Sequence, residues 1–192
     1  GHGGTLDPLA TGILPILVGS ATRSVERLHT APKVYAALVR FGYETTTDDR
    51  EGAVTREGNV PDVEGTELDR RLDPFRGEIL QAPPAYAAVK VGGRRAYQLA
   101  RAGRPVEPAE RPVRVERLEV ASWRPPDLRL LVVCGSGTYI RSLARDIGRA
   151  VGSAAHLAAL RRLAVGALSV VGSAAVDELR SGGRDAAIAR LR

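Results

Sequence analysis

The sequence contains no methionine, a single cysteine and few aromatic residues. Because methionine is absent from all 192 residues, Gly1 is not a natural translation start, and we expect a native segment before it that is missing here. A lone cysteine, Cys134, excludes an internal disulfide framework and a zinc site built on cysteines. Cys134 lies in an apolar run, so we interpret it as a small core residue. No apolar run approaches the roughly 20 residues of a membrane-spanning helix, and no signal peptide is visible.

Lysine is also scarce, so arginine supplies nearly all of the positive charge. Lys33 and Lys90 are the only lysines among 28 basic residues, against 22 acidic ones, and the net charge is +6 with a pI of about 10.1. This balance favours a polyanionic partner. Arginine binds phosphate through two hydrogen bonds and stacks on bases, which suits nucleic acid. We attribute the choice of arginine over lysine to a compositional bias, which does not explain the excess of positive charge.

The remaining composition is that of a globular domain with mixed secondary structure. Hydrophobic residues make up 44% of the chain and charged residues 26%, which suits one domain with a real core. Apolar and alternating runs predict strands over residues 12–20 (interrupted by Pro15), 33–42, 111–123 and 127–134, and a further strand before Pro83. We expect residues 43–52 to form a polar loop. Neighbouring strands can pair as hairpins, so the predicted class is α+β with a largely antiparallel sheet.

Helical spacing of apolar residues predicts the helices. They are expected over residues 21–30, from Thr66 (as a cap) to before Pro74, from Arg94 to Arg101, over 138–152 and over 175–183. The helix over 138–152 is amphipathic and should turn Ile140, Leu143, Ala144 and Ile147 inward.

A glycine-rich turn, "GSGTYIRS", follows Cys134 and leads into that amphipathic helix. Such a turn can cradle an anion. It matches neither the dinucleotide-binding pattern nor the P-loop, so a nucleotide cofactor is not expected. The alternative is an ordinary strand-to-helix turn in which Ser136 or Thr138 caps the helix.

The chain begins "GHGGTLDPLATG", which places one carboxylate, Asp7, between glycines and Pro8. No Ser-His-Asp pattern, nucleophile elbow or carboxylate pair accompanies it, and the three histidines are too far apart to suggest a metal motif. A lone catalytic carboxylate would act as a nucleophile, or as a base held by an arginine that keeps it ionised. Arg141 is a candidate for that arginine. The alternative is a surface turn, because Asp-Pro pairs are common in turns.

Several segments in order resemble the TruB family of tRNA pseudouridine synthases. "GHGGTLDPLATGILPILVGSATR" is similar to the family's catalytic-aspartate motif, and "KVYAALVRFGYETTTDDREG" resembles its tyrosine-bearing strand. "RGEILQAPPAYAAVKVGGRRAYQLARAG" resembles the insert that lies against tRNA, and "CGSGTYIRSLARDIG" with "AAHLAALRRLAVG" the third motif. The resemblance covers the chain from Gly1 to about Gly166.

The resemblance implies a role for each matching residue. Asp7 matches the aspartate that attacks the uridine, at either the ribose or the base. Tyr35 matches a tyrosine that stacks on the flipped base and moves a proton, and Arg141 matches the arginine that pairs with the aspartate. The residues matched to substrate binding are His2, Tyr139, Leu160, Lys90 and Arg94.

The resemblance also implies an organisation. We expect a pseudouridine synthase fold over residues 1–180, with a sheet flanked by helices and an RNA-binding insert at about residues 82–111. The family's segment before the aspartate motif is not present in this sequence. Residues 181–192 are expected to be a tail without a full RNA-binding domain of the PUA type. Ala87 stands where relatives often have serine.

The implied function is isomerisation of uridine to pseudouridine at position 55 in the T loop of tRNA, by base flipping and an aspartate nucleophile. It implies no metal and no cofactor, tRNA as the partner, a monomer that needs no protein partner and no membrane, and a cytoplasmic location. Two alternatives remain open: a non-catalytic RNA-binding or tRNA-folding protein on the same scaffold, and a guide-RNA-dependent relative. The long insert favours the stand-alone bacterial type over the latter.

Overall fold

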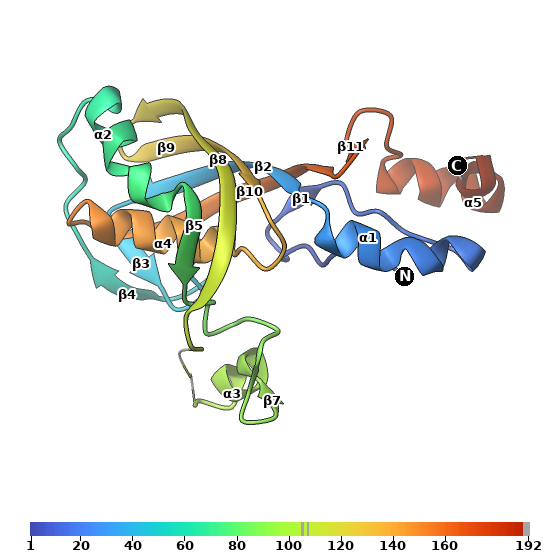
Figure 1. Ribbon diagram of the computed structural model, residues 1–192, viewed down its shortest axis with the longest axis horizontal. Coiled ribbons are helices and arrows are strands. Elements are labelled where there is room, and N and C mark those ends of the chain that lie inside the picture. The colour runs from blue at the N-terminus through green and yellow to red at the C-terminus, as the bar shows by residue number, and fades with distance from the viewer. Residues whose placement is uncertain (105, 107, 190–192) are drawn as a thin grey trace.

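A computed structural model describes residues 1–104, 106 and 108–189 of the chain (Figure 1). Its main sheet contains β1 (Thr11–Gly12), β2 (Lys33–Phe41), β5 (Gly77–Gln81), β8 (Arg111–Arg124), β9 (Asp127–Cys134), β10 (Ala155–Val165) and β11 (Leu168–Ser169). Among the described residues these seven strands run in the order β1-β10-β2-β9-β8-β5, and β11 also pairs with β10. All neighbours are antiparallel except β1 and β10, which confirms the predicted α+β class with a largely antiparallel sheet.

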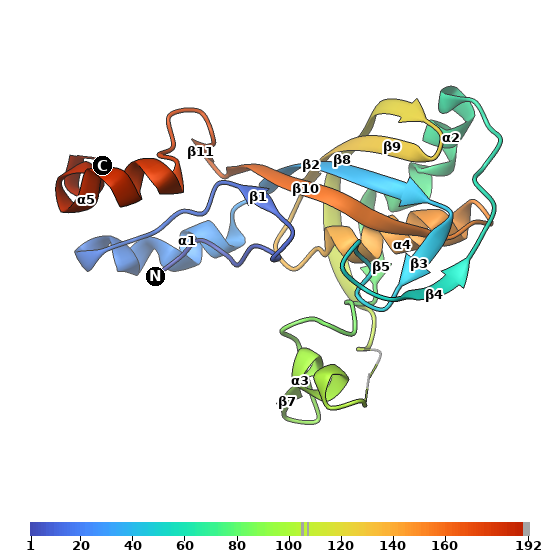
Figure 2. The same ribbon diagram turned by 180° about the vertical axis from the view of Figure 1, so that it is seen from behind.

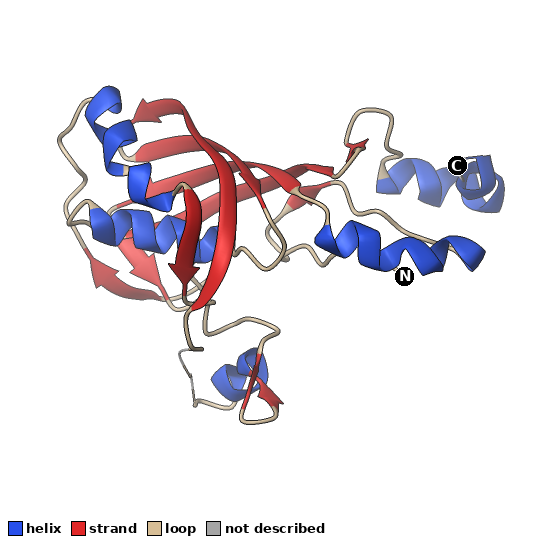
Figure 3. Cartoon of the chain, in the orientation of Figure 1, coloured by secondary structure: helices blue, strands red, loops and turns tan. Residues whose placement is uncertain are grey.

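Two short hairpins and the helices complete the fold (Figure 3). The hairpins are β3 (Tyr43–Thr45) with β4 (Val54–Glu57), and β6 (Lys90–Val91) with β7 (Arg94–Arg95). The helices are η1 (Gly19–Ser24), α1 (Val25–Thr30), α2 (Gly65–Arg71), η2 (Asp73–Phe75), α3 (Ala96–Arg101), α4 (Ile140–Ala150) and α5 (Val176–Ala189).

The core lies between α4 and the sheet. Ile140, Leu143, Ala144 and Ile147 are all buried, as the helical spacing predicts. The helix approaches β10 closely at Gly148, where an added Cβ would lie 2.6 Å from the Ala155 nitrogen. Cys134 is buried in the same core, so the interpretation of that residue is confirmed.

Two parts of the chain project from this body. The segment with η1 and α1 lies beside α5, and both extend away from the sheet (Figures 1 and 2). The insert leaves the sheet after β5, carries α3 and the β6–β7 hairpin as a separate lobe, and rejoins at β8. Residues 105 and 107 of the insert lie outside the described residues. No helix in the described part of the chain is long and apolar enough to cross a bilayer.

The strand predicted over residues 12–20 is wrong beyond its first residue. Gly12 ends β1, Ile16 forms only an isolated bridge with His2, and Gly19 begins a 3-10 helix. Pro15 explains the interruption, since it lacks an N–H group and cannot donate to a continuous ladder.

The sequence pattern also misplaced other elements. The polar loop predicted over 43–52 contains β3, and β10 was not predicted at all. Because β10 is rich in alanine and arginine, its strand propensity is weak, and pairing on both sides with β1 and β2 determines its conformation. Helix α2 begins at Gly65 with Glu64 at the N-cap, in place of Thr66. Helix α5 (Val176–Ala189) continues across residue 180, where we expect the catalytic domain to end and the tail to begin. Residues 190–192 of the expected tail lie outside the described part of the chain.

Candidate active site

One cavity of about 990 Å³ brings most of the predicted site residues together. It lies where the N-terminal segment, β2, the turn before α4, and β10 meet the root of the insert. The predicted residues that line it are His2, Asp7, Tyr35, Tyr139, Arg141 and Leu160. Segments that are distant in sequence therefore form one site.

A tight turn positions Asp7. The Asp7 carbonyl accepts a hydrogen bond from the Ala10 N–H at 2.9 Å, and Pro8 provides the fixed φ that suits the second position of such a turn. Leu9 is buried in the core, which anchors the turn. The following strand β1 runs so close to β10 that a Cβ on Gly12, where φ is +105°, would lie 2.1 Å from the Arg162 carbonyl oxygen. Only glycine fits there.

Arg141 holds the Asp7 carboxylate through two hydrogen bonds. Its Nε donates to Oδ2 at 3.1 Å and its Nη2 donates to Oδ1 at 2.9 Å. Arg141 lies in the first turn of α4 and is only 5% exposed, whereas the Asp7 side chain is 29% exposed. This planar, two-point geometry fixes the orientation of the carboxylate, and the partly exposed Asp7 side chain still lines the cavity.

The loop after β3 completes the surroundings of Arg141. Arg141 Nη1 donates to the Thr47 carbonyl at 3.0 Å and lies 3.8 Å from Asp49 Oδ2. The Thr47 hydroxyl in turn donates to Asp49 Oδ1 at 2.6 Å. Arg141 Nη2 also donates to the Tyr86 carbonyl at 3.3 Å, at the root of the insert. The guanidinium is therefore fixed on several sides, which leaves it little freedom to move.

Asp48, in the same loop, forms a second buried ion pair with α4. Arg145 Nη1 lies 2.8 Å from Asp48 Oδ2, and Asp48 has a positive φ of 58°. Burial raises the pKa of the Asp48 carboxyl to about 6, and the charge of Arg145 opposes that shift. Asp48 and Asp49 are both buried, although they belong to the segment that the sequence predicts as a polar loop.

Tyr35 faces the cavity from β2, directly across from Arg162 of β10. Arg162 is buried, and its guanidinium donates to the carbonyls of Ile13 at 2.9 Å and Gly4 at 2.9 Å. It therefore holds both sides of the loop that carries Asp7. Burial raises the pKa of the Tyr35 phenol, so the hydroxyl stays protonated at neutral pH.

Tyr139 and Leu160 form part of the cavity wall, and His2 lies at its rim. Leu160 is buried on β10, Tyr139 is half-buried immediately before α4, and His2 is exposed. Tyr139 is the N-cap residue of α4 and no side chain caps the helix there, so the prediction that Ser136 or Thr138 caps it is wrong. Ser136 donates instead to the His29 carbonyl at 2.7 Å.

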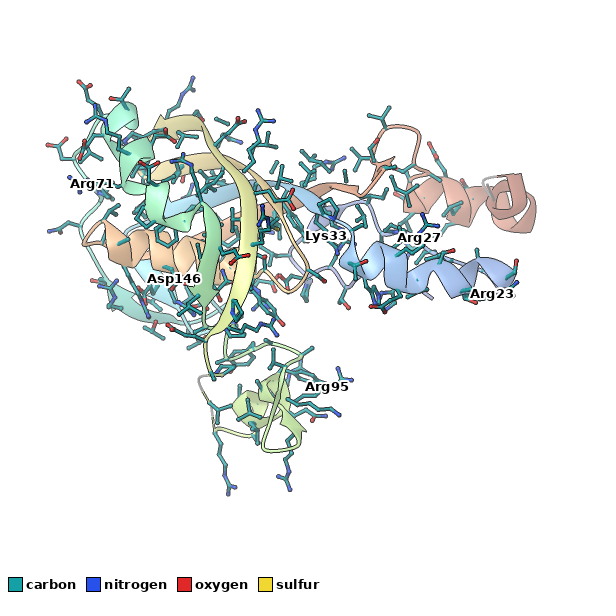
Figure 4. The ribbon with its side chains drawn as sticks, in the orientation of Figure 1. Arg23, Arg27, Lys33, Arg71, Arg95 and Asp146 are labelled. Carbon is teal, nitrogen blue, oxygen red and sulfur yellow. The ribbon has the colours of Figure 1, made fainter. Side chains whose placement is uncertain are left out.

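Lys90 and Arg94 lie outside the cavity. Both are exposed and lie on the two strands of the β6–β7 hairpin of the insert, where Lys90 is opposite Arg95 and Arg94 is opposite Val91. Figure 4 shows Arg95 on this lobe, and Arg23 and Arg27 on the projecting N-terminal segment. The two projecting parts therefore both carry exposed positive charge.

Residue patterns did not indicate three other members of the site. Asp49 lies in the segment that the sequence predicts as a polar loop, and nothing in that pattern indicates its contact with Arg141. Arg162 is one of many arginines and cannot be distinguished by its spacing. Gln81 lies at the end of β5, and its contact with Tyr139 depends on how β5 sits beside α4.

Comparison with known proteins places this arrangement in a family. Residues 1–140 match the family described as TruB family pseudouridylate synthase (N terminal domain). The tRNA pseudouridine synthase B of Xanthomonas axonopodis pv. citri is 50% identical over 163 residues, which cover 85% of this chain and 53% of that protein. The protein of the same name from Synechocystis sp. is 47% identical over 182 residues, which cover 93% of this chain and 61% of that protein. This chain thus spans little more than half the length of these relatives.

A solved structure has the same fold. The crystal structure of a Cbf5-Nop10-Gar1 complex contains a chain that aligns with a TM-score of 0.70 and 30% identity, covering 97% of this chain and 49% of that one. The family match covers most of the sequence, includes the turn with Asp7 and the strand with Tyr35, and ends at Ile140, one residue before Arg141. The chain therefore belongs to the TruB family of pseudouridylate synthases.

Proposed function

We propose that this chain converts uridine to pseudouridine at position 55 in the T loop of tRNA, with Asp7 as the nucleophile. The observation that carries the proposal is the two-point Asp7–Arg141 pair on the wall of a cavity that Tyr35 also lines. A site for binding alone does not need a carboxylate facing an RNA phosphate backbone. The names of the relatives, which are tRNA pseudouridine synthases, support the choice of substrate.

The reaction rearranges bonds within one nucleotide. The bond between N1 and C1′ breaks, the base turns, and C5 joins C1′; the C5 hydrogen leaves as a proton and N1 gains one. The Asp7 carboxylate attacks either the ribose or the base and is released at the end, so it is regenerated. No electrons are exchanged with an outside reagent, which is consistent with a site that relies on a nucleophile and proton transfer.

The cavity residues suit a base that has left its stack. Flipping costs a few kcal/mol, and we propose that Tyr35 offsets this cost by stacking on the base while Tyr139 and Leu160 enclose it. The protonated Tyr35 hydroxyl is a proton donor within the same cavity. We propose that His2, at the exposed rim, fills the gap that the base leaves in the T loop.

Exposed cations outside the cavity are proposed to hold the rest of the tRNA. Lys90 and Arg94 on the insert would contact phosphates, which gives affinity without sequence reading. The location proposed for the protein is the cytoplasm, where tRNA is modified, and it is proposed to work as a monomer.

The experiment that tests this function is incubation of the protein with unmodified tRNA, followed by mapping of pseudouridine. We expect modification at position 55 without any added RNA. Binding without modification would instead support the RNA-binding alternative. Modification that depends on an added guide RNA would support the guide-dependent alternative.

A further inference from the structure

The insert begins and ends at two residues that both contact Tyr139. Gln81 is the last residue of β5 and Arg111 is the first residue of β8, and the two are register partners in the sheet. Everything in the insert is therefore connected to the sheet through this pair. Tyr139 lies beside them, in the turn that leads into α4.

The Gln81 side chain binds both backbone groups of Tyr139, its carbonyl and its N–H. Its Nε2 donates to the Tyr139 carbonyl at 3.1 Å, and its Oε1 accepts from the Tyr139 N–H at 2.8 Å. Gln81 is only 2% exposed, so these bonds are protected from water. A buried amide that satisfies both its donor and its acceptor on one residue fixes the position of that residue.

Arg111 holds the ring of Tyr139 and the turn before it. Its guanidinium carbon lies 5.2 Å from the centre of the Tyr139 ring, which is the geometry of a cation–π contact. Its Nη2 donates to the Gly137 carbonyl at 3.0 Å. Gln81 thus fixes the backbone of Tyr139, while Arg111 fixes its ring.

The first residues of the insert make a second set of contacts with α4. The Ala82 carbonyl accepts from the Ser142 hydroxyl at 2.8 Å and from Arg145 Nη2 at 3.1 Å, and the Tyr86 carbonyl accepts from Arg141 Nη2 at 3.3 Å. Movement at the root of the insert therefore displaces groups that touch the nucleophile's partner and the cavity wall.

We propose that Gln81 and Arg111 are positioning residues that couple the insert to the base-binding cavity through Tyr139. RNA bound to the insert then restrains Tyr139, which holds this part of the cavity wall in the position that the chemical step needs. The proposal rests on the proposed function for its RNA substrate. It differs from a phosphate-binding role for Arg111, since it predicts an effect on the chemical step rather than on affinity.

The test compares Arg111→Met with Arg114→Met. Arg114 is an exposed arginine on the same strand whose side chain lies 3.8 Å from Glu78, so its loss removes the same charge without touching Tyr139. We expect Arg111→Met to lower the single-turnover rate about tenfold, the order expected for a lost cation–π contact and hydrogen bond, with little change in tRNA dissociation constant. Arg111→Lys, which keeps a cation for the ring, should recover part of the rate. Equal rates for the Arg111→Met and Arg114→Met variants, or a loss of affinity alone, would overturn the proposal.

A second readout does not depend on catalysis. Hydrogen exchange of the Tyr139 amide should be faster in Gln81→Ala than in the wild type, and bound T stem-loop RNA should slow that exchange only in the wild type. If the wild type binds this RNA but makes no pseudouridine, the proposed function fails, while the exchange result still tests the coupling between the insert and Tyr139. If bound RNA does not change the exchange rate of the Tyr139 amide in the wild type, the proposed coupling is overturned.

Discussion

Replacing Arg141 tests whether the arginine orients the nucleophile or binds RNA. Arg141→Lys keeps a positive charge but cannot form the planar two-point contact with Asp7. Arg141→Ala removes the charge as well and leaves Asp7 and the buried Asp49 without the cation that faces both. The two variants therefore separate the geometry of the contact from its charge.

The contacts of Arg141 set the expected size of these effects. Its guanidinium makes two hydrogen bonds to Asp7 and one each to the carbonyls of Thr47 and Tyr86. Removing one partner of a buried ion pair costs about 3–5 kcal/mol, and we expect Arg141→Ala at the lower end because Asp7 is partly exposed. A nucleophile displaced by about 1 Å loses on the order of 100-fold in rate. Arg141→Lys should lose at least that much while it remains folded.

The assay measures the single-turnover rate of pseudouridine formation and the tRNA dissociation constant for each variant, with urea unfolding for stability. Arg149→Lys is the matched control, because Arg149 forms a comparable two-point contact with Glu44 from the same helix, remote from the cavity. We expect the control to retain its rate. If both Arg141 variants lose affinity in parallel and keep the single-turnover rate, Arg141 is a phosphate contact and the reasoning is refuted.

Three further predictions follow from other parts of the molecule. Affinity for tRNA should fall steeply with salt because bound phosphates release counterions, and Arg94→Glu with Arg95→Glu should weaken binding and flatten that dependence; a dissociation constant that ignores salt would contradict this. The pKa of Asp48 is raised from 3.8 to about 6 in the folded state, so the protonated carboxyl stabilises the fold at low pH and this stabilisation is lost as pH rises. The free energy of unfolding of the wild type minus that of Asp48→Asn should therefore fall by about 3 kcal/mol between about pH 4 and 6. A difference that does not change with pH would disprove the shift. Gly12→Ala should destabilise the fold by about 2 kcal/mol or more through backbone strain and the clash with Arg162, as thermal unfolding can measure; an unchanged melting temperature would show that β1 can move away.

Local patterns predicted the parts of the fold in which neighbours in sequence determine the structure. The spacing of Ile140, Leu143 and Ile147 is enough to place α4 on the core, and alternation in β8 and β9 is enough to predict strands. Strand β10 could not be found in this way, since its conformation depends on pairing with strands far away in the chain.

The same distinction applies to the site. The resemblance identified Asp7 and Arg141, and the structure brings them into contact. The contacts of Gln81 and Arg162 could not be predicted, because each side chain binds the backbone of a distant segment, and glutamine or arginine at those positions carries no local signal. The buried loop at Asp49 was misread because its polar residues satisfy one another and Arg141 instead of facing water.

The central claim is that Asp7 is the nucleophile, and the Asp7→Asn variant tests it most directly. The amide has the same shape but cannot attack, so the variant should remain folded and bind tRNA. The measurement is single-turnover pseudouridine formation with enzyme in excess over tRNA, alongside the dissociation constant. We predict no pseudouridine above the reaction without enzyme, with binding retained; measurable turnover by Asp7→Asn would contradict the claim.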